Sequence, residues 1–266
     1  MRMSAIANSM VQRHGLGQAF LLASLAFATL AGAVISGFAS DNNPADRDQF
    51  RTHAEKILTV AQKRYETEPT NTVAAWEMGR ACFGLVTVLE DRKEMERIIN
   101  EGIAACRASV ALDSTSAAGH YYLAVTVGKL ADLKRNLAAY GMVKEVEREF
   151  HKAQELDERF CYAGPDRCLG ELYLKAPGWP VSVGSRSKAR KHLERAAELA
   201  PDFPENRLLL AEAYLKWRDK KPLARELEAL EQLWPAARTN FAGADWAADW
   251  GDWQPRFDKL RENVRP

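Results

Sequence analysis

Four segments of this chain place small or apolar residues at one recurring spacing of four, three and three positions, followed two positions later by a turn residue. They are Gly102-Cys106-Ser109-Leu112-Ser114, Val146-Phe150-Ala153-Leu156-Glu158, Ala189-Leu193-Ala196-Leu199-Pro201 and Leu223-Leu227-Leu230-Leu233-Pro235. Offsets of three and four put the first four residues of each set on one helix face, and we expect the helix to stop at the fifth. Such recurrence predicts a stack of supersecondary units rather than one enclosed core.

A second motif, upstream of each of these segments, indicates that every unit has two helices. Its clearest copies are Gly170-Glu171-Leu172-Tyr173 and Ala211-Glu212-Ala213-Tyr214, and weaker copies begin at Gly79 and Ala124. The small residue lets two helices approach, and the aromatic residue fills the groove between them. Tetratricopeptide repeats of about 34 residues have this pattern. The sequence therefore predicts an all-α fold, an α-solenoid of about four tetratricopeptide-like hairpins with a C-terminal capping helix.

The predicted organisation has four parts. Residues 1–39 form a signal segment, 40–70 a lead-in helix, 71–235 the four hairpins, and 236–266 a Trp-rich C-terminal cap. In the cap, the spacing of Trp246, Trp250, Trp253 and Phe257 puts the aromatics on one helix face. Solenoids need such a cap over the last repeat. The interleaved aspartates Asp245, Asp249 and Asp252 are expected to face water, in preference to binding a metal ion.

The distance between the two motifs differs from unit to unit, with gaps of 23, 22, 19 and 12 residues. In units one and two the extra residues are compatible with longer helices. Unit three instead inserts Ala176-Pro177-Gly178-Trp179-Pro180-Val181-Ser182-Val183-Gly184, whose prolines and glycines cannot continue a helix. This insertion predicts a loop that projects from the third hairpin.

The N-terminal segment is typical of an export signal. Arg2 and Arg13 precede an uncharged stretch over residues 19–39, with small residues before the first acidic residue, Asp41. We expect an exported, periplasmic protein that is cleaved after Ala39, with cleavage after Ala33 or an uncleaved membrane anchor as alternatives. No cysteine lies at its end, so no lipid anchor is predicted. Cleavage would remove two of 37 basic and none of 36 acidic residues, changing the net charge from +1 to −1. A near-neutral chain gives no electrostatic reason to bind nucleic acid.

Neither the cysteines nor the histidines form a recognisable catalytic or metal-binding motif. The pairs Cys82 with Cys106 and Cys161 with Cys168 could form disulfides in an exported chain, but the sequence favours buried free cysteines. The five histidines are isolated, and we expect His192 to be a solvated residue beside a helix ridge. The sequence therefore predicts no enzyme, no cofactor and no metal site.

Two groups of residues are candidates for binding a ligand or partner. Asp166 and Arg167 follow Pro165 at the expected start of a helix. Trp179 lies on the projecting loop, where it is either a plug that packs over units three and four or an aromatic wall that contacts a ligand or partner. In the repeat geometry, Glu171, Lys175, Glu212 and Lys216 face the concave groove together with Lys129, whereas the alternative is two Glu-to-Lys pairs along helices. Tyr173 completes the candidate site: Asp166, Arg167, Tyr173, Lys175, Trp179, Glu212 and Lys216.

Three stretches resemble the TatT family, the periplasmic T components of tripartite ATP-independent periplasmic (TRAP) transporters. They are residues 162–167, the Leu172-to-Pro180 segment with Gly184, and Ala200-Pro201-Asp202-Phe203-Pro204-Glu205-Asn206, within a similarity over residues 70–258. The resemblance implies a degenerate tetratricopeptide fold, a trimer, and a groove that works with a solute-binding subunit. A weaker likeness, through the same loop, is to the regulator-of-microtubule-dynamics repeat proteins.

Two functions follow as hypotheses. In the first, the protein is an accessory subunit of a periplasmic solute-uptake system that docks a solute-binding protein and holds a small ligand near Trp179 and Tyr173. In the second, it is a scaffold for envelope proteins that binds partners on its concave face and takes no small ligand.

Overall fold

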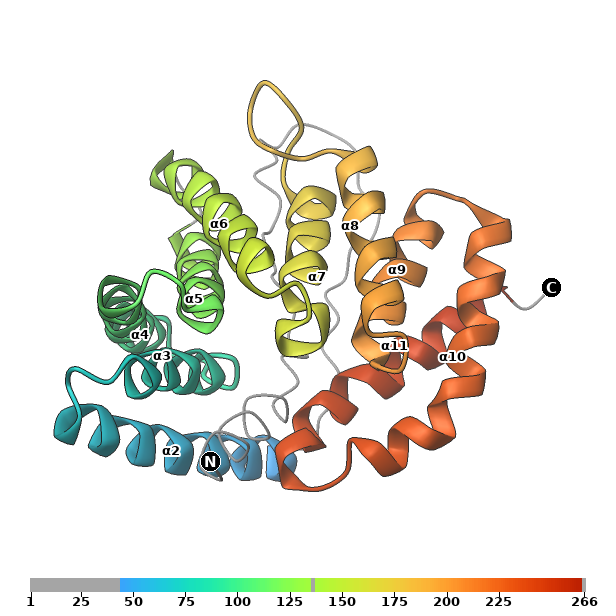
Figure 1. The fold of residues 1–266 in the computed structure, drawn as a ribbon. Coiled ribbons are helices and arrows are strands. Elements are labelled where there is room, and N and C mark those ends of the chain that lie inside the picture. Colours follow the sequence, from blue (N-terminus) through green and yellow to red (C-terminus); the bar gives the residue numbers. More distant parts are fainter. Residues whose placement is uncertain (1–43, 135–136, 265–266) are drawn as a thin grey trace.

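A computed structural model describes residues 44–134 and 137–264, and the predicted signal segment lies outside these ranges. The described helices follow one another as pairs. After α2 (Pro44–Thr67) come α3 (Thr72–Val86) with α4 (Arg92–Leu112), α5 (Ala117–Lys134) with α6 (Leu137–Leu156), α7 (Phe160–Lys175) with α8 (Arg186–Leu199), and α9 (Pro204–Lys216) with α10 (Lys220–Asn240). The chain closes with the short η1 (Ala244–Trp246) and with α11 (Ala247–Val264). The prediction of an all-α solenoid is confirmed (Figure 1).

Side chains in the connecting turns fix where several helices begin. Asn71 accepts hydrogen bonds from the backbone N–H groups of Val73 and Ala74, and Asp91 accepts one from Glu94. Each satisfies a backbone donor that the first helical turn would otherwise leave without a partner. These caps therefore fix where α3 and α4 begin.

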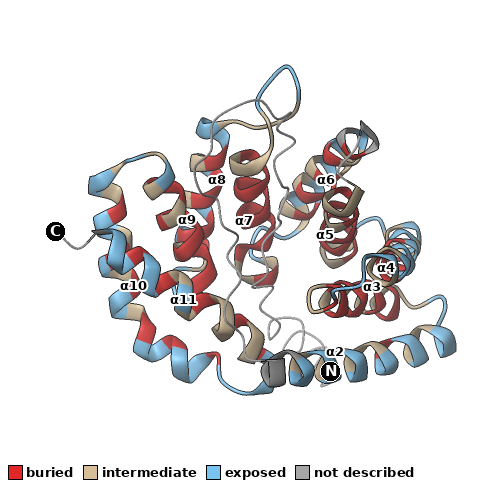
Figure 2. Ribbon diagram, turned by 180° about the vertical axis from the view of Figure 1, so that it is seen from behind, coloured by how far each residue is buried: buried red, intermediate tan, exposed pale blue. Residues whose placement is uncertain are grey.

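Burial follows the predicted packing faces except at the fourth ridge position, where Leu112 is 44% exposed and Leu156 and Leu233 are only partly buried. The residues that face neighbouring helices are buried, and the outward faces are exposed (Figure 2). One buried cluster extends from α3 to the start of α8, and a second extends from Leu193 in α8 to Leu260 in α11. A chain of adjoining cores, rather than one enclosed core, is the expected property of a solenoid.

The first described helix touches the start of the C-terminal cap. His53 Nε2 in α2 lies 3.2 Å from Asp245 Oδ1 in η1, and both figures show α2 beside the C-terminal cap (Figures 1 and 2). The arc of hairpins is therefore joined at its ends by a contact between residues 192 positions apart.

Two details of the predicted C-terminal region are wrong. Pro235 does not end its helix, because α10 continues to Asn240. Trp234 and Ala237, on either side of the proline, are buried against the second core, and this packing outweighs the one backbone hydrogen bond that proline cannot make. The aspartates do not all face water either: Asp249 is only 3% exposed, and Asp252 accepts a hydrogen bond from Arg256. The aromatic residues Trp246, Trp253 and Phe257 are buried, as predicted.

The remaining expectations about length and cysteines have mixed outcomes. In unit one only residues 92–95 of the extra segment are helical, and 88–91 lie in the turn after α3. The helices α4, α5 and α6 have 21, 18 and 20 residues, but α10, in the unit without extra residues, also has 21. All four cysteines are buried free thiols, so neither disulfide that the sequence allowed is present. Within residues 44–134 and 137–264, the helices are either too short or too polar to cross a membrane.

Candidate functional site

The insertion of the third hairpin forms a loop with a fixed base. We call residues 176–185 the Trp179 loop. The backbone N–H of Gly184 donates to the Pro177 carbonyl at 2.8 Å, and that of Ser185 donates to the Tyr173 carbonyl at 2.9 Å. A Cβ atom at position 184 would lie 2.0 Å from the carbonyl oxygen of Ala176, so only glycine allows the two strands of the loop to approach this closely. The loop therefore leaves the hairpin in one defined direction (Figure 1).

Trp179 lies at the outer part of this loop and does not pack on the protein. It is 89% exposed, and Val181 beside it is 56% exposed. Val183, nearer the base, packs against the first core. The expectation that Trp179 is a plug over units three and four is therefore wrong. The loop is anchored by Val183 and its backbone bonds, and its large aromatic residue faces solvent.

The start of α7 departs from regular helix. Residues 161–163 have φ values of 52°, 57° and 59°, in the left-handed region that non-glycine residues seldom adopt. Arg167 donates to the carbonyls of Cys161 and Tyr162, and Asn206 of α9 donates to the Tyr162 carbonyl at 3.0 Å. The Tyr162 ring also stacks on Phe203, with 4.5 Å between the ring centroids. These contacts hold a turn that would cost about 1–2 kcal/mol per residue if it were unsupported.

Arg167 and Asp166 are therefore buried groups inside the repeat stack. Arg167 is 2% exposed and Asp166 is 1% exposed. Asp166 Oδ1 accepts from Gln154 Nε2 at 2.8 Å and lies 2.7 Å from His192 Nδ1, whereas Asp166 Oδ2 has no hydrogen-bond partner among the described residues. His192 is 8% exposed, so the expectation of a solvated histidine is wrong. His192, in α8, is connected to α7 through its contact with the Asp166 carboxylate.

Tyr173 links three helices by its hydroxyl and its ring. The hydroxyl donates to Glu147 Oε1 at 2.6 Å and lies 3.1 Å from His151 Nε2, both in α6. The ammonium group of Lys188 in α8 lies 4.6 Å from the centre of the ring. Burial and the neighbouring Glu147 carboxylate raise the pKa of Tyr173, so its hydroxyl remains a hydrogen-bond donor.

The charged residues that were expected to face the groove have three kinds of partner: a carboxylate on the same helix, an arginine of α11 and a backbone carbonyl. Lys175 pairs with Glu171 along α7, as the alternative interpretation of the sequence predicted. Glu212 does not pair with Lys216. It accepts from Arg256 of α11 at 2.8 and 3.0 Å, while Lys216 Nζ donates to the Leu174 carbonyl at 3.2 Å. The candidate residues are thus divided between the repeat stack and the exposed loop.

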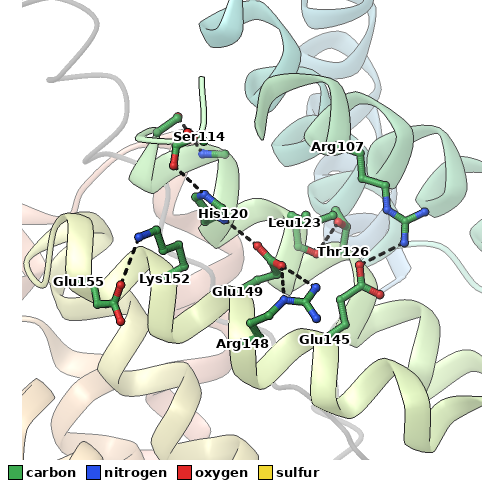
Figure 3. A network of polar contacts seen from close by, with 12 residues as sticks. Arg107, Ser114, His120, Leu123, Thr126, Glu145, Arg148, Glu149, Lys152 and Glu155 are labelled. Atoms are coloured by element: carbon green, nitrogen blue, oxygen red, sulfur yellow. Dashed lines mark hydrogen bonds and ion pairs between the residues drawn. The ribbon is translucent and has the colours of Figure 1, made fainter. Parts of the chain in front are cut away.

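A buried histidine–carboxylate pair also occurs away from these residues. In Figure 3, His120 of α5 lies between Glu149 of α6 and the carbonyl of Ser114, with His120 Nδ1 2.6 Å from Glu149 Oε2. Arg148 also donates to this carboxylate. The His192–Asp166 pair has the same form, one hairpin further along. Both pairs join packed helices through buried polar groups, as structural pairs do, although Asp166 Oδ2 keeps no partner among the described residues.

Three residues of this region escaped the sequence-based site: His192, Asn206 and Arg256. Each owes its role to a contact with a distant segment, such as Asn206 with Arg167 at 3.0 Å. Only Asn206 carried a signal, since it belongs to the stretch that resembles a known family. In the described part of the chain, no group of three or more His, Cys, Asp or Glu residues is arranged to hold a metal ion.

The fold and the comparisons with known proteins define a tetratricopeptide-like helical repeat protein. The structure is similar to the crystal structure of a thermophilic tetratricopeptide protein of Thermus thermophilus, with a TM-score of 0.60 at 17% sequence identity over 82% of this chain and 99% of that one. The family described as Regulator of microtubule dynamics protein 1-3 matches residues 44–162. No curated protein matches the chain.

The family match falls in an unexpected place. It covers α2 to α6 and ends before the Trp179 loop, through which the sequence likeness to those proteins was drawn. It also covers the units in which the repeat motif is weakest. The likeness to a helical repeat protein is therefore established in both halves of the chain, while the resemblance to the TatT family stays a prediction.

Proposed function

We propose that this protein is a non-enzymatic binding protein that docks a partner protein through the Trp179 loop. One observation carries the proposal: a tryptophan that is 89% exposed on a loop with a fixed base. Tryptophan is strongly enriched among the residues that dominate binding energy at protein interfaces. A loop with a defined direction also loses little conformational freedom when it binds.

The partner to test first is a periplasmic solute-binding protein. This choice rests on the resemblance to the TatT family and on the export signal expected over residues 1–39. On this proposal the protein is exported, serves a solute-uptake system and functions as a homo-oligomer, with a trimer implied by the same resemblance. Its role is to position the solute-binding protein rather than to catalyse a reaction.

The test is cross-linking in cells, followed by affinity capture of the full chain and identification of the captured proteins. We expect recovery of a solute-binding protein by the wild type and its loss in Trp179→Ala. The exposed position of Trp179 means that the substitution should leave the melting temperature unchanged. Val60→Ala is the matched control, because Val60 is 70% exposed on α2, away from the loop, and should capture the partner normally.

Lys216→Ala separates this proposal from a scaffold that binds partners on its concave face. Lys216 is exposed, and its ammonium group donates to a backbone carbonyl. Loss of capture in Lys216→Ala with full capture in Trp179→Ala would overturn the loop proposal in favour of a concave-face scaffold. Recovery of outer-membrane or assembly proteins, still dependent on Trp179, would keep the loop as the docking element and replace the partner.

A further inference from the structure

The inner side of α3 carries an arginine whose buried nitrogen atoms lack hydrogen-bond partners. Arg80 directly follows Gly79, the same repeat position that Glu171 and Glu212 occupy in later units. It lies one helical turn after Trp76, whose ring stacks on Tyr122 of α5 with 5.5 Å between centroids and 7° between planes. The Nε and Nη1 atoms of Arg80 are buried, and neither has a hydrogen-bond partner in the described structure.

Tyr122 supplies a second donor of the same kind. It is completely buried, and its hydroxyl likewise has no partner among the described residues. Burial raises the pKa of this hydroxyl well above its ordinary value, so it keeps its proton and can donate. More than nine-tenths of buried polar groups in proteins are satisfied, so several unsatisfied donors around one stacked pair require an acceptor from elsewhere.

Two guanidinium groups, those of Arg80 and Arg167, act on the same pair of buried residues. Arg80 and Arg167 each lower the pKa values of Tyr122 and Cys161 against the effect of burial, in keeping with the stacking of Tyr122 on Trp76, one helical turn from Arg80. Arg167 itself donates to carbonyl and amide oxygens, which are uncharged acceptors. Burial raises the pKa of Cys161, so its thiol stays neutral.

The carboxylate that acts on Arg167 is already engaged. Glu205 influences Arg167 but accepts hydrogen bonds from Arg256 at 2.9 Å and from Trp253 at 2.8 Å. Burying an arginine without a counter-charge is costly, and the usual compensation is an anion. Cys161 also opens the left-handed turn, and such strained backbone is concentrated at ligand sites.

We propose that Arg80 and the Tyr122 hydroxyl bind the carboxylate of a small organic acid on the inner side of α3 and α5. A carboxylate offers only acceptors, which matches the unpaired donors of both residues. The Trp76 ring stacks on Tyr122 and the Phe160 ring lies edge-on to Tyr122 at 6.1 Å, so the aromatic surroundings of this hydroxyl suit an apolar acid better than a hydrated inorganic ion. This site is independent of the Trp179 loop.

Calorimetric titration of the full chain with sodium benzoate tests the site, with benzamide as a neutral ligand of the same shape and sulfate as an inorganic anion. We expect benzoate alone to bind. Affinity should fall about 10-fold or more in Arg80→Met and by a smaller factor in Tyr122→Phe, since hydrogen bonds to charged groups are the stronger ones. Arg97→Met, which removes an exposed arginine of α4, and Trp179→Ala should both bind as the wild type does.

The ligand-free proteins provide a second readout. Because the buried nitrogen atoms of Arg80 have no partner in the described structure, Arg80→Met should melt at a higher temperature than the wild type. A lower melting temperature would show that Arg80 has a structural partner and would overturn the proposal. So would equal binding of benzamide or sulfate, undiminished binding by Arg80→Met, or no heat from benzoate up to about 10 mM, a concentration that detects even millimolar affinity.

Discussion

The hydroxyl of Tyr173 in α7 donates a 2.6 Å hydrogen bond to Glu147 of α6, the second helix of the preceding hairpin. One repeat further on, Tyr214 of α9 donates a bond of the same length to Glu194 of α8. The two tyrosines occupy the same position of the sequence motif. The repetition of the motif is therefore also a repetition of one contact, which fixes the register between successive hairpins.

Removing these hydroxyls should weaken two separate interfaces. We expect Tyr173→Phe and Tyr214→Phe each to lower the free energy of unfolding by about 1.5 kcal/mol, because each hydroxyl bonds to a carboxylate. The two bonds share no partner, so the double variant should equal the sum within about 0.5 kcal/mol. Urea unfolding measures all three values. A strongly non-additive double variant would mean that the two interfaces are not independent.

Gly79 and Gly84, both in α3, should respond to alanine in opposite directions. A Cβ at position 79 would lie 2.0 Å from Cys106 Sγ, whereas a Cβ at position 84 has no atom within 4 Å. We expect Gly79→Ala to cost about 1–3 kcal/mol through overpacking, and Gly84→Ala to add about 0.5–1 kcal/mol through helix propensity. Thermal unfolding of the two variants checks this contrast.

Combining Gly79→Ala with Cys106→Ala tests whether the Cys106 sulfur causes this cost. It removes the sulfur that a side chain at position 79 would meet, so Gly79→Ala should be less damaging in the Cys106→Ala background than in the wild type. If the cost of Gly79→Ala is the same in both backgrounds, the close approach of α3 and α4 is limited by another contact, such as the Gly102 carbonyl at 3.1 Å.

Glu205 should make the stability of the protein depend on pH. Burial raises its pKa from 4.5 to about 7, against the opposing effect of Arg256. The folded state therefore holds this proton more tightly than the unfolded state. The resulting stability is fully present below about pH 4.5, and on the order of 3 kcal/mol is lost as the pH rises to about 7.

The measurement is the free energy of unfolding across this pH range for the wild type and for Glu205→Gln. The variant should lack the part of the slope that belongs to Glu205, while Glu198→Gln, an exposed change on α8, should keep it. Burial also raises the pKa of Asp252, so a smaller slope of the same sign should remain in Glu205→Gln. Identical slopes in wild type and Glu205→Gln would contradict the assignment.

The sequence predicted the repeat architecture because the packing of paired helices depends on periodic residues. The small residue Gly79 and the ridge residue Cys106 each stood out by their spacing, and the structure brings them together across the first hairpin. The Trp179 loop was likewise predictable, since its prolines and glycines exclude helix. Its exposure was not predictable, because composition does not reveal whether an aromatic side chain finds a surface to cover.

What the sequence could not reveal depends on contacts between distant residues. No local signal marks the left-handed residues 161–163, whose conformation is held by Arg167 and Asn206 from outside the turn. Pro235 is a helix-ending signal that tertiary packing overrides. His192 looked solvated because its partner, Asp166, is 26 positions away in the chain.

The contact between His53 and Asp245 changes how this solenoid can deform. In an open stack of repeats, the angle at each junction between hairpins can change independently of the angles at the other junctions. While this contact holds, a change of angle at one junction has to be matched at the others. The two side chains are 38% and 43% exposed, so the contact is worth at most about 1 kcal/mol, and it restrains only small deformations of the arc.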